Sequence, residues 1–238
     1  MKLVQKMSVG LSLACAVMLT SCSKEDVQTP EPQAVSVNPS SNLKTAALPW
    51  IAPTKSYGGF NTFPYLWERV TGGGEGSNTA TYPAGTSTSM GLWANKAFPW
   101  LEYFPMVPAQ PWNSFVTVTS TTDYKWEKAD MSQAKTTIKY LKPGYTYVME
   151  FYVTSARPKA NASAAYVGNA LVTLSAKGTN QFFDTYMLAN PQNNWIKRTI
   201  EFVANDTEMT FTFGATSSQK GKKAYAHLFI GQNAIWQK

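Results

Sequence analysis

The feature that most constrains the fold of this 238-residue chain is a set of short segments in which apolar and polar side chains alternate. In the clearest, YTYVMEFYVT at 145–154, every odd position holds an aromatic or aliphatic side chain. A period of two places successive side chains on opposite faces of a strand, so we predict a strand whose odd face lies in the core. Lys142-Pro143-Gly144 before it is typical of a turn, because proline fixes φ and glycine accepts positive φ.

Similar segments recur along the second half of the chain. We predict strands at 114–119, 136–141, 169–176, 196–203, 208–215, 224–230 and 234–236. The inward-facing residues are predicted to include Ile196, Ile200 and Phe202 in one strand and Met209, Phe211 and Phe213 in the next. Residues 50–112 are rich in Gly, Pro and aromatic residues and indicate only short strands. This pattern predicts an all-β protein, a jelly-roll β-sandwich of two antiparallel sheets.

The first 21 residues have the features of an export signal. Lys2 and Lys6 precede Val9–Leu19, an apolar stretch of eleven residues that is too short to span a bilayer. The following Leu19-Thr20-Ser21-Cys22 resembles the lipobox of bacterial lipoproteins. The resemblance implies cleavage before Cys22, attachment of diacylglycerol to its thiol and acylation of the new amino terminus. The alternative is an ordinary secretory signal followed by an incidental cysteine.

The next residues predict a location and a tether. Ser23-Lys24-Glu25-Asp26 resembles the surface-export signal of Bacteroidota lipoproteins, which implies an outer-membrane lipoprotein facing the extracellular side. The alternative is a solvated polar spacer. Residues 22–48 contain three prolines and many small polar residues, typical of a flexible tether. We therefore expect a signal peptide at 1–21, a lipidated tether at 22–48 and a single sandwich domain at 49–238.

The segment from Pro143 to Ile235 resembles the carbohydrate-binding jelly rolls of the galactose-binding-like superfamily. It carries, in order, a Pro-Gly turn, YTYVMEFYVTSAR, ALVTLSA, Trp195 leading into RTIEFV, EMTFTFGA and AHLFIGQNAI. The resemblance implies glycan binding and gives Trp67 and Trp195 structural roles. Many relatives hold a structural calcium ion, but Gln232 and Asn233 stand where relatives often have Asp. We therefore expect no cofactor and do not favour a calcium site.

Aromatic residues are concentrated between Trp93 and Trp126, a segment interrupted by four prolines at 99–111. Rings in proline-rich loops are hard to bury completely, and a flat ring suits the apolar face of a sugar. The alternative is that these rings form a loop-side core closing one end of the sandwich. The candidate ligand-binding residues are Trp93, Trp100, Tyr103, Trp112 and Trp126, together with Glu150 and Tyr152 on the polar face of the strand at 145–154.

Little in the sequence indicates catalysis. Glu150 and Glu201 have the pattern of polar-face residues, His227 lies in an alternating strand with no motif around it, and no Gly-x-Ser-x-Gly elbow occurs. We therefore predict no catalytic residues and no metal ligands. The lysines of 220–223 lie in a Ser/Gln/Gly loop without a larger basic stripe, so nucleic acid is not an expected partner.

The predicted function is binding of a polysaccharide or oligosaccharide without cleavage, at the outer-membrane surface. The aromatic segment leaves a second interpretation open, in which it contacts a protein partner such as a neighbouring surface protein. A lyase or hydrolase built on the same sandwich is the third.

Replacement of Cys22 tests the lipid anchor. Cys22→Ser removes the thiol that would receive the lipid, so the variant should leave the membrane fraction and lose metabolic labelling with a fatty acid. Fractionation of cells expressing both forms checks this. Equal membrane retention of the variant would contradict the lipoprotein interpretation.

Overall fold

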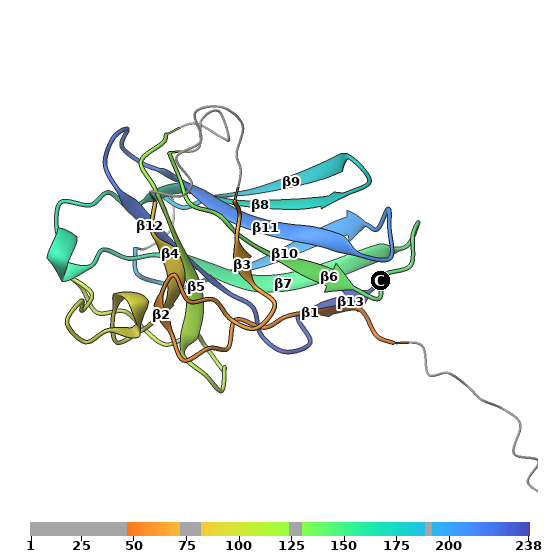
Figure 1. Cartoon of the computed structure of the whole chain (residues 1–238), viewed down its shortest axis with the longest axis horizontal. Coiled ribbons are helices and arrows are strands. Elements are labelled where there is room, and N and C mark those ends of the chain that lie inside the picture. Colours follow the sequence, from red (N-terminus) through yellow and green to blue (C-terminus); the bar gives the residue numbers. More distant parts are fainter. Residues whose placement is uncertain (1–46, 72–81, 124–129, 189–191) are drawn as a thin grey trace, which may run out of the picture. The chain divides into compact units, whose positions relative to one another are not determined.

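The structure, a computed structural model, describes residues 47–71, 82–123, 130–188 and 192–238, and these are built almost entirely of strands (Figure 1). The signal peptide, the tether up to residue 46 and Trp126 lie outside the described residues. The strands are β1 (Trp50–Ile51), β2 (Gly59–Phe60), β3 (Glu68–Arg69), β4 (Ala84–Thr88), β5 (Ser114–Ser120), β6 (Ala134–Lys139), β7 (Thr146–Ser155), β8 (Val167–Ala176), β9 (Thr179–Tyr186), β10 (Ile196–Val203), β11 (Met209–Ser217), β12 (Ala224–Phe229) and β13 (Ile235–Gln237). Two 3₁₀ turns, η1 (Leu92–Ala94) and η2 (Lys159–Asn161), are the helical segments of the described part.

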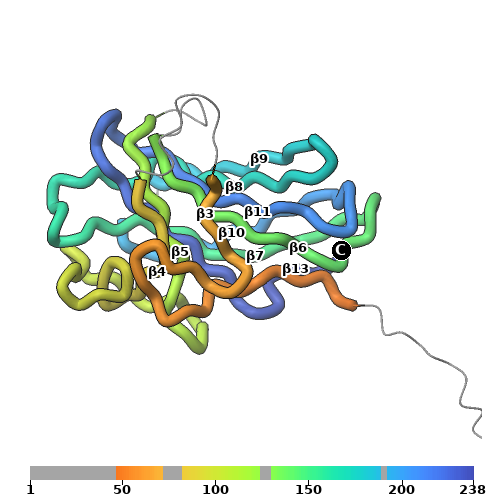
Figure 2. The backbone as a smooth tube through the Cα atoms, viewed as in Figure 1, coloured from red at the N-terminus to blue at the C-terminus, as the bar shows by residue number. Residues whose placement is uncertain are grey.

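The strands form two sheets in which every ladder is antiparallel. Sheet A has the order β1-β6-β11-β8-β9, with β3 also paired to β6. Sheet B has the order β10-β7-β12-β5-β4-β2, with β13 also paired to β7. From β5 onward the chain changes sheet at nearly every connection, which is visible along the backbone tube (Figure 2). The predicted jelly-roll sandwich of two antiparallel sheets is therefore confirmed.

The main core lies between the sheets and follows the predicted alternation. Tyr147, Met149, Phe151 and Val153 of β7 are each at most 2% exposed. The other members of the predicted inward rows are also buried, except Ile196, which is half-buried against the core. Tyr145 is the exception on the odd face, with 51% of its surface exposed, because it lies in the turn before β7.

The turns before β7 and between β8 and β9 contain glycine residues with positive φ. Gly144 has φ 84°, and the Tyr145 backbone N–H donates to the Lys142 carbonyl at 3.2 Å, as expected for the predicted turn. Strand β9 was not predicted, although Lys177 and Gly178, with φ 49° and 74°, form the two-residue hairpin that joins it to β8. Both central residues of such a turn require positive φ, and glycine in the second position is the sequence signal.

Removing a core ring should destabilise the sandwich strongly. Phe211 is fully buried and packs edge-on against Trp67 and Phe151. Phe211→Ala should lower the free energy of unfolding by about 3–5 kcal/mol, since it removes buried contacts and leaves a cavity. The matched control is Thr212→Ala, on the opposite face of β11, which should change it by about 0.5 kcal/mol or less. Denaturant unfolding measures both, and equal effects would contradict this assignment of the faces.

Candidate functional site

A second apolar cluster, the outer cluster, covers the face of sheet B that points away from sheet A. Phe115, Tyr225 and Phe229 alternate with core residues along β5 and β12, so they project outward. The connection at 89–113 passes over them and completes the outer cluster (yellow in Figure 1). The cluster consists of Leu92, Trp100, Phe104, Val107, Phe115, Ala156, Ala164, Tyr225 and Phe229, with Trp93, Trp112, Tyr152 and Trp195 partly buried against it. Much of the aromatic segment is thus a loop-side core.

Trp100 belongs to the interior of the outer cluster. It is 8% exposed, and its indole N–H donates to the Thr88 carbonyl at 2.9 Å. Its loop is tied to the β7–β8 connection, since Lys159 N–H donates to the Pro99 carbonyl and Leu101 N–H to the Arg157 carbonyl, each at 2.8 Å. Trp100 therefore offers no ring face to a ligand, and its predicted binding role finds no support in its position.

His227 lies fully buried within the same cluster. The ring centroids of Trp100, Phe104 and Phe115 are 4.9–5.4 Å from that of His227, and its Nδ1 lies 3.0 Å from the Thr117 hydroxyl oxygen. Burial lowers the pKa of His227 to about 3, opposed in part by a backbone hydrogen bond with Ala156. The imidazole is therefore neutral at physiological pH and packed, which agrees with the sequence interpretation.

A polar cluster fixes the loops at this end of the sandwich. Glu102 accepts hydrogen bonds from Arg157, from the Tyr166 hydroxyl at 3.0 Å and from the Asn193 amide at 3.1 Å. Burial would raise the pKa of Glu102, but these hydrogen bonds outweigh it and lower the pKa below its ordinary value. The carboxylate thus joins the β4–β5, β7–β8 and β9–β10 connections, and we assign it a structural role.

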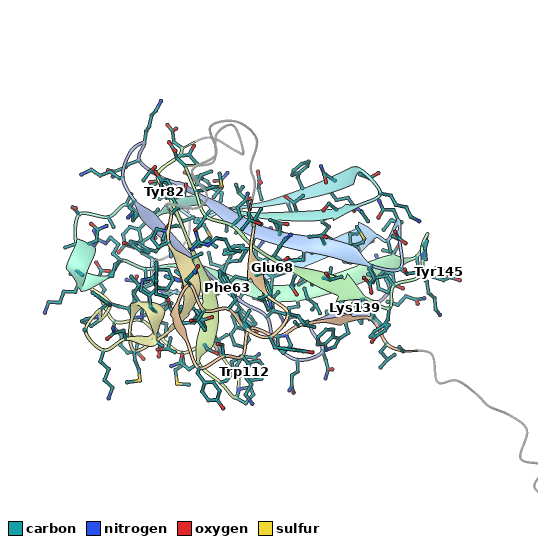
Figure 3. All side chains as sticks on the ribbon, in the orientation of Figure 1. Phe63, Glu68, Tyr82, Trp112, Lys139 and Tyr145 are labelled. Carbon is teal, nitrogen blue, oxygen red and sulfur yellow. The ribbon has the colours of Figure 1, made fainter. Side chains whose placement is uncertain are left out.

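The open edge of the outer cluster brings together three of the candidates predicted from sequence. Trp112 and Tyr152 both pack on Phe229, at centroid distances of 5.4 and 6.3 Å. Glu150 lies two residues from Tyr152 on the same face of β7 and forms an ion pair with Lys197 at 2.7 Å. Hydrogen bonding to Glu150 raises the pKa of Lys197. Figure 3 shows Trp112 at the lower edge of the ribbon, below the strands.

The remaining candidates lie elsewhere. Trp93 is half-buried and packs edge-on against Phe60 at 5.6 Å. Tyr103 is 85% exposed on the loop, and Trp126 lies outside the described residues.

A pocket of about 450 Å³ lies beside Trp112, between the start of the domain and the turn before β13. Its lining combines two aromatic rings with one ammonium and two amide side chains: Trp50, Pro53, Lys55, Tyr65, Gln232 and Asn233. Tyr65 is 77% exposed. The Nζ atom of Lys55 lies 6.0 Å from the centroid of Trp112, so this lysine links the pocket lining to Trp112. We call this lining the amide–aromatic pocket.

Buried hydrogen bonds hold the backbone of the pocket in place. Thr54 N–H donates to the Ile230 carbonyl at 3.0 Å, and Ile230 N–H donates to the Thr54 hydroxyl at 3.2 Å. The Ser114 hydroxyl donates to the Thr54 carbonyl at 3.1 Å and accepts from the Ser56 N–H at 2.9 Å. The residues on both sides of Lys55 are therefore fixed to β5 and to the end of β12.

A second pocket of about 460 Å³ adjoins the first at Asn233. It is mainly apolar and is lined by Ala47, Leu48, Pro49, Tyr140, Lys142, Tyr147, Asn233, Ile235, Trp236 and Gln237. Asn233 has φ 55°, a conformation that asparagine tolerates better than most residues. The turn before β13 thus separates two pockets.

Sequence reasoning did not select the amide–aromatic pocket. Gln232 and Asn233 were noted only as replacements for Asp, and Trp50, Lys55 and Tyr65 carry no motif. The sequence feature that could have indicated the pocket is the presence of Trp50 and Tyr65 in a stretch rich in Gly and Pro. Its pairing with the turn at 231–233 depends on the tertiary fold.

Within the described ranges, no group of three or more His, Cys, Asp or Glu side chains could hold a metal ion. In the same ranges, no helix has both the length and the apolar character required to cross a membrane. Neither of the two pockets contains a carboxylate among its lining residues.

Comparison with known proteins gives structural likenesses only. No protein-family model matches the chain, and no curated protein matches it. Among solved structures, TmCBM61 in complex with β-1,4-galactotriose is 11% identical, with 65% of this chain and 88% of that chain covered and a TM-score of 0.37. The CBM22-1 xylan-binding domain from Paenibacillus barcinonensis Xyn10C is 10% identical, with 79% and 92% covered and a TM-score of 0.41. The enzymatically active domain of bacteriophage CBA120 tailspike protein 4 is 10% identical, with 76% and 21% covered and a TM-score of 0.43.

The buried histidine predicts a specific pH dependence of stability. An unfolded chain protonates histidine below about pH 6.5, whereas the folded pKa of His227 is about 3. Between these values the unfolded state binds more protons, so His227 should reduce stability by up to about 1.4 kcal/mol per unit as pH falls. In His227→Gln, the free energy of unfolding measured from pH 7 to 4 should no longer contain the decrease caused by His227. An imidazole NMR signal titrating near pH 6.5 in the folded protein would contradict the prediction.

Proposed function

We propose that this protein binds glycan without cleaving it, and that a lipid on Cys22 holds it on the extracellular side of the outer membrane. The observation that carries the binding function is the amide–aromatic pocket. Tyr65 and Trp50 present ring surfaces suited to the apolar face of a sugar. The side-chain amides of Gln232 and Asn233 supply polar groups that bind hydroxyls.

The surroundings of the pocket support an extended ligand. Lys55 connects the pocket to Trp112, and Asn233 connects it to the second pocket, where Trp236 is 43% exposed. A chain of sugars lying across the turn at 231–233 would contact aromatic rings on both sides. We therefore expect affinity to increase with oligosaccharide length until both pockets are filled.

The carboxylates support binding rather than hydrolysis. Glycosidases use two carboxyl groups across the scissile bond, one of them kept protonated. Glu150 and Glu201 share one face of sheet B, because Glu150 is opposite Thr199 in the β7–β10 ladder. Each forms an ion pair with a lysine, Lys197 and Lys238 respectively, at 2.7 Å, and neither lines a described pocket.

The test compares two tyrosine variants in a binding assay. A panel of soluble neutral and acidic polysaccharides is screened by affinity electrophoresis, and the best ligand is then titrated by calorimetry. Tyr65→Ala should weaken binding about twofold to tenfold, because an aromatic contact contributes about 0.5–1.5 kcal/mol beyond its buried area. Tyr186→Ala, which removes an exposed ring of β9 in sheet A outside both pockets, is the control and should bind like the wild type.

Two results would contradict the proposal. Binding to no glycan, together with a stable co-purifying protein, would favour a protein-binding function. Release of reducing sugar by the purified protein would show that it is an enzyme.

A further inference from the structure

We infer that the amide–aromatic pocket selects acidic sugars, with Lys55 receiving the carboxylate of a uronic acid residue. This inference rests on the proposed glycan-binding function and adds the chemical class of the ligand. It begins from the charge of the pocket, in which one ammonium and two amides are accompanied by no carboxylate.

Lys55 differs in its surroundings from several other surface lysines. Lys135, Lys177, Lys197 and Lys238 each form an ion pair with a carboxylate of the protein. Lys55 is exposed and forms no ion pair with any described residue, and its contact is with the ring of Trp112. Its positive charge is therefore available to a ligand.

The backbone that carries Lys55 is unusually well fixed for a loop. Thr54 and Ser56 both hydrogen-bond to Ser114, and Thr54 is also bonded in both directions to Ile230. The lysine is consequently presented from a buried, hydrogen-bonded junction. The backbone therefore loses little freedom when Lys55 binds a ligand, although its side chain must still be ordered.

The other lining groups complete a site for a uronate. The amide N–H groups of Gln232 and Asn233 can donate to carboxylate or hydroxyl oxygens. Tyr65 and Trp50 provide ring faces for the C–H surface of the same sugar. A neutral sugar would use the rings and amides but would leave Lys55 without a counter-charge.

The chain is basic, with 21 Lys and Arg against 14 Asp and Glu, and it stays basic, at 19 against 14, without Lys2 and Lys6 of the expected signal peptide. Such an excess attracts polyanions over distances of about 10 Å at moderate ionic strength. Long-range attraction alone has no preference for one lysine, so the experiment must isolate the contribution of Lys55.

The test uses pairs of ligands that differ only in the carboxyl group. Oligomers of galacturonate, mannuronate and glucuronate are each compared with their own carboxyl-reduced forms by calorimetry in 50 mM NaCl. The wild type should bind at least one acidic oligomer about fivefold more tightly than its reduced form. Lys55→Gln should remove this preference and should change binding of the reduced form much less than binding of the acidic form, and 0.5 M NaCl should weaken the preference.

Two further variants separate the local contact from the general charge. Lys159→Gln removes an exposed lysine from η2, outside both pockets, and should keep the full preference. Lys55→Arg retains the positive charge and should keep most of the preference for the acidic oligomer. Loss of preference in Lys159→Gln to the same degree as in Lys55→Gln would overturn the inference.

The outcomes distinguish this inference from the proposed function. Equal binding of acidic and reduced oligomers would overturn acid selectivity and leave glycan binding intact. Absence of binding to both forms of every oligomer, and to the wider polysaccharide panel, would overturn the proposed function and with it the selectivity.

Discussion

Strand β12 is buried on both faces, and this constraint determines which parts of sheet B reach solvent. One face packs into the core between the sheets, and the other lies under the connection at 89–113. A strand apolar on both sides cannot be left open to water, so the long loop must cover it. Trp100 and Phe104 of this loop are buried in the outer cluster, whereas Trp112 and Tyr152 are only partly buried against it. Partly exposed rings on this face of sheet B therefore lie at the margin of the outer cluster.

The pocket depends on the same arrangement through the end of β12. Ile230 follows the strand directly and is bonded to Thr54, which fixes the start of the domain against the turn at 231–233. Residues 50–65 and the turn at 231–233, which are far apart in sequence, thereby form one pocket that combines aromatic rings with polar groups. The charge on Lys55 then suggests which sugars would be preferred.

Much of the fold was predictable from local pattern, whereas most of the site was not. Strand β10 was predicted with its observed bounds, because its alternation is regular and polar turn residues flank it. Strand β9 was missed, because it is an edge strand in which adjacent Phe182 and Phe183 obscure the period of two. Whether an aromatic ring is exposed was harder to predict than the position of a strand. Trp100 and Tyr65 both lie near prolines, yet one is buried and the other open, since only the tertiary fold decides what covers each ring.

The position of β12 also affects when the domain can fold. The strand lies near the C-terminal end of the sequence but pairs with both β5 and β7 in the middle of sheet B. Until residues 224–229 are available, β5 and β7 have no common neighbour and Phe115 lacks its contact with the His227 ring. Such long-range pairing makes folding slow and dependent on residues 224–229. A chain cut before residue 224 would therefore leave β5 and β7 without the strand that joins them in the middle of sheet B.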